Sequence, residues 1–365
     1  MFGHRLVTNW RGRYNAKQVF KSFAKNAKGH PAKADLNDSG KRLPNCGTAS
    51  IPTECRLNFQ PVLGYCCLWS DRIVAHQSPL KWDDFPFDPS PFIKDQARIN
   101  PAYASSLGAL YADDCMAILP WIKDGVVDTV FADPPFNLGK AYGNRSNDSL
   151  SEKAYLDWCQ QWVTECVRVL KPGGSLFLYN LPKWNVLLGA FLSNLGMEFR
   201  HWIAVEISAC LPIPGRLHPS HYSLLYHTKG KPNTFRRIRT PILRCRHCGG
   251  EVKDYGGHRD AMNPKGVTLK DVWTDIPPVR HWKYKSKDRP ANALSTKILD
   301  RVIEMSTLAG DLVLDPFGGS GTTFAVCERK HRHWLGAEID FADEIIDRLE
   351  SGLIQSHKND DFVER

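Results

Sequence analysis

The chain has 365 residues, of which 42% are hydrophobic and 24% charged, so most of it can fold around a core as one large α/β domain with a smaller insert. The net charge of +9 permits an anionic partner such as nucleic acid without requiring one. The 11 scattered cysteines argue against a disulfide scaffold, and the lack of a long apolar run or a signal-type apolar core argues against a membrane or secreted protein, so we expect a soluble cytoplasmic chain.

Residues 1–99 differ in character from the rest of the chain. They are basic at first and then rich in proline, serine and asparagine, with no sustained helical or strand period. The prolines of residues 81–91 forbid regular structure, which is typical of a linker. Two interpretations stay open for this segment: a basic arm that contacts nucleic-acid phosphates, or, as we expect more, a poorly ordered extension with solvated charges.

A regular alternation of apolar segments begins near Tyr111. Residues 126–132 predict a strand, which ends because the two prolines that follow cannot continue it. Residues 155–170 predict a helix whose apolar side chains share one face, and Lys171-Pro172-Gly173-Gly174 ends it. The next predicted elements are a strand at 175–180, a helix at 183–195 and strands at 199–207 and 224–227.

The alternation is interrupted at residues 228–288, which are polar and basic, and then resumes. The later elements are a helix at 293–306, a strand at 311–314, a helix at 322–328, a strand at 334–339 and a helix at 342–349. Repeated β-α units predict a mainly parallel sheet with helices on both faces. We therefore divide the chain into an N-terminal extension at residues 1–99, a domain whose two halves are residues 100–227 and 289–352, an insert between these halves at residues 228–288, and a tail at residues 353–365.

Residues 312–323, LVLDPFGGSGTT, form a glycine-rich turn between a predicted strand and a predicted helix. Glycines let the backbone approach a ligand without a Cβ in the way, and the start of a helix offers free N–H groups. The next strand ends at Glu338, which can accept both hydroxyls of a ribose, while the lack of a following lysine disfavours a phosphate-rich nucleotide. The alternative is a turn that only packs a strand on a helix. The residues expected to contact a cofactor are Asp315, Phe317, Gly318, Gly319, Ser320, Gly321, Thr322 and Glu338.

The most specific feature is the turn Asp133-Pro134-Pro135-Phe136, which follows an apolar strand. The prolines hold it rigid and remove N–H donors, so the Asp133 carboxylate and the Pro134 carbonyl are acceptors that point the same way. Two acceptors that hold the N–H bonds of an aromatic amine would free its delocalised lone pair for attack on a methyl group. Phe136 offers a face on which a base can stack, for about 1–3 kcal/mol. The alternative is an ordinary proline-stiffened turn.

With DPPF and DPFGGSGTT, residues 111–349 resemble the amino-group DNA methyltransferases, in the permuted order that places the catalytic motif before the cofactor motif. YADDCMAIL, from Tyr111, resembles the family segment whose acid contacts the cofactor adenine, and Asp114 is the matching acid, with Asp113 where the family has glycine. RVLKPGGSLFLY and AMNPKGVTLKDVWTDIPPVR also match family segments. The final cofactor helix of the family begins His-Pro-Thr-Gln-Lys-Pro, and here only Lys297 aligns with it as a cofactor contact.

The resemblance implies a Rossmann-like S-adenosylmethionine-dependent methyltransferase fold, with a mostly parallel seven-stranded sheet and a target-recognition insert at residues 228–288. It also implies S-adenosylmethionine as cofactor and duplex DNA as substrate, with the target base flipped out at a cost on the order of a few kcal/mol. In this family an aspartate before Pro-Pro-aromatic goes with adenine N6, and a serine with cytosine N4. We therefore expect a site-specific adenine N6 methyltransferase that is cytoplasmic and associated with the nucleoid.

Basic side chains in two segments are expected to contact DNA. Those of the insert could bind phosphates or read guanine edges, and the loop at residues 137–151 could close on the duplex. For the insert, the alternative is a solvated basic loop. The residues concerned are Arg236, Arg237, Arg239, Arg244 and Arg246 in the insert, and Lys140 and Arg145 in the loop.

The segment Cys245-Arg246-His247-Cys248 has the spacing of a zinc knuckle. A structural zinc ion needs four ligands, and the candidates to complete the pair Cys245 and Cys248 are His247, His258 and Cys210. Since one cysteine pair is a weak signal, we expect a reduced, metal-free turn, with structural zinc as the alternative.

Three other functions stay open beside adenine N6 methylation. They are transfer to cytosine N4, transfer to an RNA or a protein amide, which also presents a planar amine, and DNA binding without catalysis. The last would be marked by loss of Asp133 or of the glycine turn, and both are intact. The resemblance also leaves open a homodimer and a partner restriction or defence protein.

Overall fold

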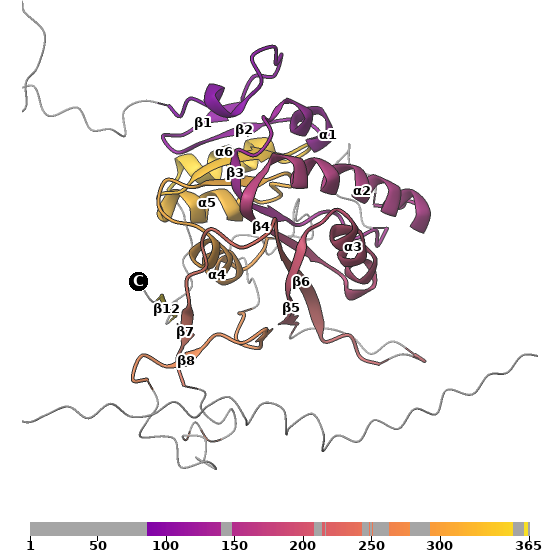
Figure 1. The fold of residues 1–365 in the computed structure, drawn as a ribbon, viewed down its shortest axis with the longest axis vertical. Coiled ribbons are helices and arrows are strands. Elements are labelled where there is room, and N and C mark those ends of the chain that lie inside the picture. The colour runs from indigo at the N-terminus through magenta and orange to yellow at the C-terminus, as the bar shows by residue number, and fades with distance from the viewer. Residues whose placement is uncertain are drawn as a thin grey trace, which may run out of the picture. The chain divides into compact units, whose positions relative to one another are not determined.

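The computed structural model describes residues 86–139, 148–207, 214–215, 217–242, 248, 250, 263–277, 293–352 and 361–363. Within these residues the main feature is a nine-stranded sheet in the order β1-β2-β11-β10-β3-β4-β6-β5-β9 (Figure 1). Its strands are β1 (Tyr103–Ala104), β2 (Gly108–Tyr111), β11 (His333–Ala337), β10 (Leu312–Asp315), β3 (Val127–Ala132), β4 (Leu170–Asn180), β6 (His221–Thr228), β5 (Glu198–Glu206) and β9 (Val272–Trp273).

The described sheet has seven central strands, as predicted, and one additional strand at each edge. The edge strands β1 and β9 have two residues each, which is too short for a strand period to be read from the sequence. Five of its strand pairs are parallel, which confirms the predicted mostly parallel sheet. The antiparallel pairs are β1 with β2, β4 with β6 and β5 with β6.

Helices cover both faces of the sheet (Figure 1). One face packs against α1 (Cys115–Ile118), α2 (Glu152–Val169) and α3 (Pro182–Asn194), and the other against α4 (Thr296–Ser306), α5 (Thr322–Arg329) and α6 (Ala342–Glu350). The side chains of β4 alternate accordingly, with Leu176 and Leu178 in the first core and Phe177 and Tyr179 in the second. A strand buried on both faces explains the continuous apolar runs of the sequence.

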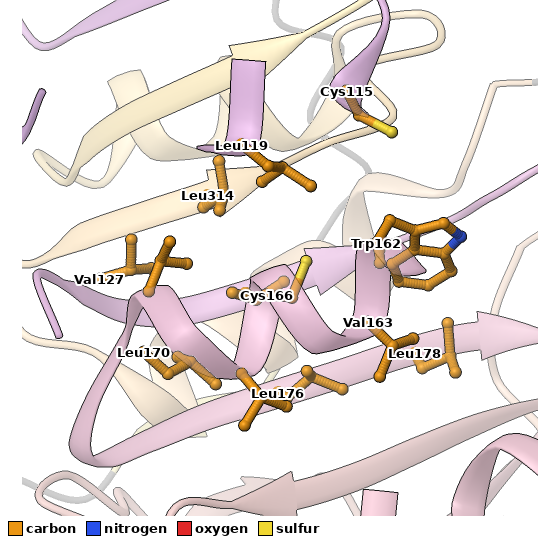
Figure 2. Packing of buried hydrophobic residues seen from close by; sticks show 14 of the residues in the cluster. Cys115, Leu119, Val127, Trp162, Val163, Cys166, Leu170, Leu176, Leu178 and Leu314 are labelled. Atoms are coloured by element: carbon orange, nitrogen blue, oxygen red, sulfur yellow. The ribbon is translucent and has the colours of Figure 1, made fainter. Parts of the chain in front are cut away.

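Helix α2 supplies the largest part of the first core. Ser151 caps its N-terminus by accepting a hydrogen bond from the amide of Ala154 at 3.3 Å. Figure 2 shows Cys166 of this helix above Leu176 of β4, and Val163 beside Leu178 of the same strand. The predicted end of the helix is confirmed within one residue, but the predicted loop Lys171-Pro172-Gly173-Gly174 is the first part of β4.

A second, three-stranded sheet has the order β12-β7-β8, and all its pairs are antiparallel. Strands β7 (Ile238–Thr240) and β8 (Val267–Thr268) come from the predicted insert, whereas β12 (Phe362–Val363) comes from the segment predicted as a tail. A strand at β12 was not predicted, because a strand of two residues forms only through pairing with a distant segment and leaves no pattern in the sequence.

Part of the predicted N-terminal extension packs on the domain. The 3-10 helix η3 (Ser90–Phe92) leads to Ile93, which is 8% exposed and forms a β-bridge with Ile122, just after the 3-10 helix η4 (Leu119–Trp121). The expectation of a poorly ordered segment therefore does not extend to residues 86–99, whose few apolar side chains pack on the first core. Residues 1–85 lie outside the described residues. In the described part, no helix has the length and apolar character needed to cross a membrane.

Candidate active site

The site lies where the carboxyl ends of two adjacent parallel strands meet. Asp315 is the last residue of β10, and Asp133 follows the end of β3. The two strands pair in parallel, with Leu314 opposite Val130, although their sequences are far apart. From this point the sheet continues to β11 on one side and to β4 on the other. In open α/β sheets such a switch point is where ligands bind.

The glycine turn after β10 is held by Asp315, which is 2% exposed. Its carboxylate accepts a hydrogen bond from the amide of Phe317 at 2.9 Å and another from the hydroxyl of Thr323. Burial raises the pKa of Asp315 to about 7, although both hydrogen bonds act to lower it. Gly321, with φ of +73°, forms the N-cap of α5 in a left-handed conformation that suits glycine.

Glu338 follows β11 and holds the same turn from the other side. One carboxylate oxygen accepts a hydrogen bond from the amide of Gly319 at 2.6 Å, and the other accepts from the amides of Asp340 and Phe341. The side chain is 7% exposed, and its burial raises its pKa. Glu338 therefore shapes the turn as well as bordering the cavity described next, a role that the sequence did not predict.

A cavity of about 250 Å³ opens between these elements. Of the residues predicted to bind a cofactor, Asp114, Phe317 and Glu338 line it, together with Pro135 of the Asp-Pro-Pro-Phe turn. Asp114 is also the N-cap of α1 and accepts a hydrogen bond from the amide of Met116 at 2.8 Å. The structure thus joins residues from the two motif blocks around one space.

Two residues of this region were missed by the sequence analysis because they come from helices. Trp158 of α2 lines the cavity, and its ring lies 5.7 Å from that of Phe317 in an edge-on arrangement. Arg348 of α6 donates hydrogen bonds to the carbonyl of Ser320 at 2.6 Å and to the hydroxyl of Thr322 at 3.0 Å. Each lies on an amphipathic helix where many residues could face the core, so the pattern alone does not single it out.

Asp133 is partly buried, and Pro134 is buried. Burial raises the pKa of Asp133 well above its usual range, and the nearby carboxylate of Asp315 raises it further. Among the described residues, none donates a hydrogen bond to the Asp133 carboxylate or to the Pro134 carbonyl. The carbonyls of Pro135 and Phe136, by contrast, each accept one, from the hydroxyl of Tyr155 at 2.6 Å and from the indole N–H of Trp184 at 2.9 Å.

Phe136 belongs to a group of three aromatic rings. Its centroid lies 6.1 Å from that of Tyr179 on β4 and 5.4 Å from that of Tyr222 on β6. Tyr179 and Tyr222 lie 5.4 Å apart. Burial and the nearby Asp133 both raise the pKa of Tyr179. The predicted stacking residue therefore has two partners, which the sequence analysis did not identify because the strands carrying them pair only in the fold.

After the turn, hydrogen bonds join the two ends of a loop at Asn137 and Asp148, which we call the pinned base. Asp148, which is 4% exposed, accepts hydrogen bonds from the amides of Asn137 and Leu138. Asn137 exchanges two hydrogen bonds of 2.8 Å with the backbone of Leu150. Lys140 and Arg145, the predicted DNA contacts of this loop, lie outside the described residues.

Lys297 is not among the residues that line the cavity. Its ammonium group lies 2.8 Å from the carboxylate of Asp275, which also pairs with Arg301. Arg301 is 1% exposed and forms a second ion pair with Asp361 at 2.7 Å. This cluster joins α4 to the predicted insert and to the segment before β12. In the structure Lys297 thus pairs with Asp275, which the fold brings to α4, and its contact with a cofactor stays a prediction.

The predicted DNA-binding arginines differ in their surroundings. Arg236 forms an ion pair with Glu304 of α4 at 2.6 Å, so its charge is engaged within the domain. Arg239 donates a hydrogen bond to the carbonyl of Gly266 at 3.1 Å. Arg237 is exposed. Arg244 and Arg246 lie outside the described residues.

The structure gives no support to a zinc site. Cys248 is exposed, and its predicted partner Cys245 lies outside the described residues, as do His247, His258 and Cys210. Within the described part of the chain, no three histidine, cysteine, aspartate or glutamate residues gather in a way that could hold a metal ion.

Comparison with known proteins identifies relatives of this arrangement. A family model described as DNA methylase matches residues 127–347. The type II methyltransferase M.BamHI of Bacillus amyloliquefaciens is 52% identical over 303 residues, which cover 80% of this chain and 69% of that protein. The type II methyltransferase M.HpaI of Haemophilus parainfluenzae is 31% identical over 250 residues, or 66% of this chain and 74% of that protein.

A solved structure gives the same result for the fold. The PvuII DNA methyltransferase, described as cytosine-N4-specific, matches with a TM-score of 0.51 and 18% sequence identity. The match covers 72% of this chain and 92% of that one. At this level of identity the likeness concerns the fold alone.

Proposed function

Because the chain belongs to the DNA methylase family of amino-methyltransferases, we propose that it transfers a methyl group from S-adenosylmethionine to the exocyclic amine of a base in duplex DNA. The observation that carries this proposal is that Pro135 of the catalytic turn lines one cavity together with Phe317 and Glu338 of the cofactor motif. The same turn offers two acceptors, the Asp133 carboxylate and the Pro134 carbonyl. Neither acceptor is engaged by a donor of the described residues.

The cavity suits the nucleoside part of S-adenosylmethionine. The carboxylates of Glu338 and Asp114 are acceptors for ribose hydroxyls and for the adenine amine, and Phe317 and Trp158 offer apolar walls. Buried carboxylates also suit a cation, and Asp315 lies close enough to Asp133 to raise the pKa of Asp133 beyond the effect of burial. When bound, S-adenosylmethionine supplies a methyl group activated by a positively charged sulfur.

The residues of the catalytic turn would act on the amine rather than on the methyl group. The Asp133 carboxylate and the Pro134 carbonyl accept hydrogen bonds from the two N–H groups of the amine, which favours a tetrahedral nitrogen with its lone pair free. After transfer the nitrogen is positively charged and must lose a proton, and Asp133, with its raised pKa, is placed to take it. Phe136, Tyr179 and Tyr222 provide the faces against which a flipped base would stack.

Adenine N6 is the first candidate for the target, because the family motif with aspartate before Pro-Pro-Phe goes with adenine. Cytosine N4 is the second candidate. Both bases present an amine beside a ring nitrogen, so the two acceptors serve either one, and the PvuII enzyme, which has the same fold, is described as cytosine-N4-specific. In this proposal, exposed Arg237 and the rest of the insert at 228–288 contact the duplex.

Two proposals on assembly follow from the family alone. A homodimer would be seen as a doubled mass by light scattering of the purified chain. A partner restriction protein would cleave the same site in unmethylated DNA, and methylation by this chain would protect the site. Failure of protection against such a partner would contradict the pairing.

The proposed reaction is tested by nucleoside analysis. Purified protein is incubated with S-adenosylmethionine and unmethylated duplex DNA of varied sequence, which is then digested and measured by mass spectrometry. We expect N6-methyladenine, whereas N4-methylcytosine would keep the mechanism and correct the base. The Asp133→Ala variant should yield neither product and still bind the cofactor. Methylation of RNA or protein but not of DNA would contradict the proposal, and so would an active Asp133→Ala variant.

A further inference from the structure

The Asp133-to-Phe136 turn is held in place by two side chains from outside it. Tyr155 of α2 donates a hydrogen bond to the Pro135 carbonyl at 2.6 Å, and Trp184 of α3 donates one to the Phe136 carbonyl at 2.9 Å. The two donors are both 2% exposed, and their rings lie 4.6 Å apart. They therefore form one packed unit against the turn.

The turn needs such support because its two middle residues have no backbone donors. Pro134 and Pro135 have no N–H groups, so neither can form the hydrogen bonds that usually fix a turn. The carbonyls after Asp133 remain as acceptors, and side-chain donors from other elements can reach them. Tyr155 and Trp184 take the last two, which leaves the Pro134 carbonyl for the substrate.

The direction of the Tyr155 proton is also fixed. The amide nitrogen of Asn180, which is fully buried, donates to the Tyr155 oxygen at 3.0 Å. An amide nitrogen cannot accept, so the tyrosine must direct its own proton elsewhere, and the Pro135 carbonyl is the acceptor at hand. Asn180 ends β4, the strand beside β3, so the sheet itself sets this chain of hydrogen bonds.

We propose that Tyr155 and Trp184 are positioning residues for methyl transfer, which orient the peptide groups after Pro134 so that its carbonyl and the Asp133 carboxylate face the amine together. This inference rests on the proposed function. It adds to that function two aromatic donors, on α2 and α3, that fix the orientation of the catalytic turn. Small errors in such an alignment lower the rate of a reaction more than they lower the affinity for the reactants.

The test uses Tyr155→Phe and Trp184→Phe in the full chain. Each variant keeps an aromatic ring and loses a donor. Single-turnover rates are measured at saturating S-adenosylmethionine and duplex DNA, beside the dissociation constant of the cofactor and the KM for DNA. We expect each variant to lower the rate on the order of 10- to 100-fold, with both binding constants within about two-fold of the parent.

Matched controls separate positioning from general destabilisation. Tyr103→Phe changes a tyrosine on the edge strand β1. Trp334→Phe removes a buried indole N–H that donates to Glu328 at 2.7 Å, a bond comparable to that of Trp184 but on β11. Thermal unfolding is recorded for all four variants, and the assays are run well below the lowest midpoint. The controls should retain the parental rate even where Trp334→Phe lowers the midpoint.

The outcomes are distinct. A parental rate in Tyr155→Phe would overturn the inference and leave the proposed function in place. The same holds if Trp334→Phe loses as much rate as the two test variants for an equal loss of stability. If Trp184→Phe does not fold, the nearly isosteric Tyr155→Phe decides. If the parent chain itself methylates no DNA, the proposed function fails and the inference fails with it.

Discussion

Arg348, on the last helix of the domain, donates a hydrogen bond of 2.6 Å to the carbonyl oxygen of Ser320 in the glycine turn. The same guanidinium reaches the Thr322 hydroxyl at the start of α5. Replacing it by methionine should weaken cofactor binding about ten-fold, since a hydrogen bond to a charged group is worth about 1.5–3 kcal/mol and part of that acts through the turn. Titration calorimetry with S-adenosylmethionine measures this effect.

Arg348→Lys should recover part of the affinity, because one of the two hydrogen bonds can re-form. Arg329→Met is the control: Arg329 pairs with Asp300 on α4 at the other end of α5. This variant should lower stability without changing the cofactor affinity. Equal affinities in Arg348→Met and the parent would show that the turn keeps its shape without this contact.

The affinity for S-adenosylmethionine should rise with pH. The pKa of Asp315 is raised to about 7, so its carboxyl group is mostly protonated at pH 6 and mostly ionised at pH 8. If the cationic cofactor favours the ionised form, its affinity should increase about ten-fold across this range, and Asp315→Asn should reduce the increase. Calorimetry in buffers of different ionisation enthalpy should detect proton release on binding, and a flat profile would contradict the assignment.

The same shift has the opposite consequence for the free protein. A carboxyl group whose folded pKa lies above its unfolded value of about 3.9 holds its proton more tightly when folded. Its contribution to stability is therefore present below pH 4 and is lost as the pH rises toward 7. Urea unfolding of the parent and of Asp315→Asn across this window gives the difference.

Gly318 should not tolerate a side chain. A Cβ at this position would lie 2.9 Å from the ring of Phe324 and 3.0 Å from Ile345. Gly318→Ala should therefore cost about 1–3 kcal/mol of stability through overpacking and should weaken cofactor binding. For comparison, Gly310 has φ of +85° and open space within 4 Å of the position that a Cβ would take, so Gly310→Ala should cost about 1–2 kcal/mol from backbone strain and leave cofactor binding unchanged.

Asp361 should matter for folding although it lies near the end of the sequence. Its side chain is 3% exposed and pairs with Arg301, which is 1% exposed. Asp361→Ala would leave the buried guanidinium to Asp275 alone among the carboxylates of the described residues, so we expect a loss of about 3 kcal/mol in the free energy of unfolding. Chemical denaturation measures it, and a loss below about 0.5 kcal/mol would show that the pair is replaced by solvent.

The sequence predicted the features that depend on local chain geometry. The proline turn after β3 and the glycine turn after β10 are each encoded by consecutive residues that restrict or free the backbone, and both lie where expected. The alternation of apolar segments likewise predicted the long helices and the central strands other than β2, although β4 begins five residues before the predicted strand. Cofactor and catalytic motifs could be placed in one site because parallel strands have their carboxyl ends at the same edge.

The contacts that were missed or misplaced depend on pairing between distant segments. Tyr155 and Trp184 look like ordinary core positions of amphipathic helices, and only the fold shows that their polar atoms meet the catalytic turn. Lys297 was assigned to the cofactor because it aligns with the final cofactor helix of the family, and Arg236 was assigned to DNA because it is one of the basic residues of the insert. In the fold Lys297 pairs with Asp275 and Arg236 pairs with Glu304, and no local sequence pattern connects either pair.

The pinned base formed by Asn137 and Asp148 has a consequence for how relatives of this chain can diverge. Its hydrogen bonds join residues 137–139 to Asp148 and Leu150. Because these bonds join the two ends of the intervening segment close to the catalytic turn, a change at Asn137 or Asp148 should disturb Asp133 and Pro134 more than a change between them. Relatives could then vary in sequence and length between Gly139 and Asp148 while the reactive turn keeps its position, and a library randomised at positions 140–147 would test whether the base alone holds that turn.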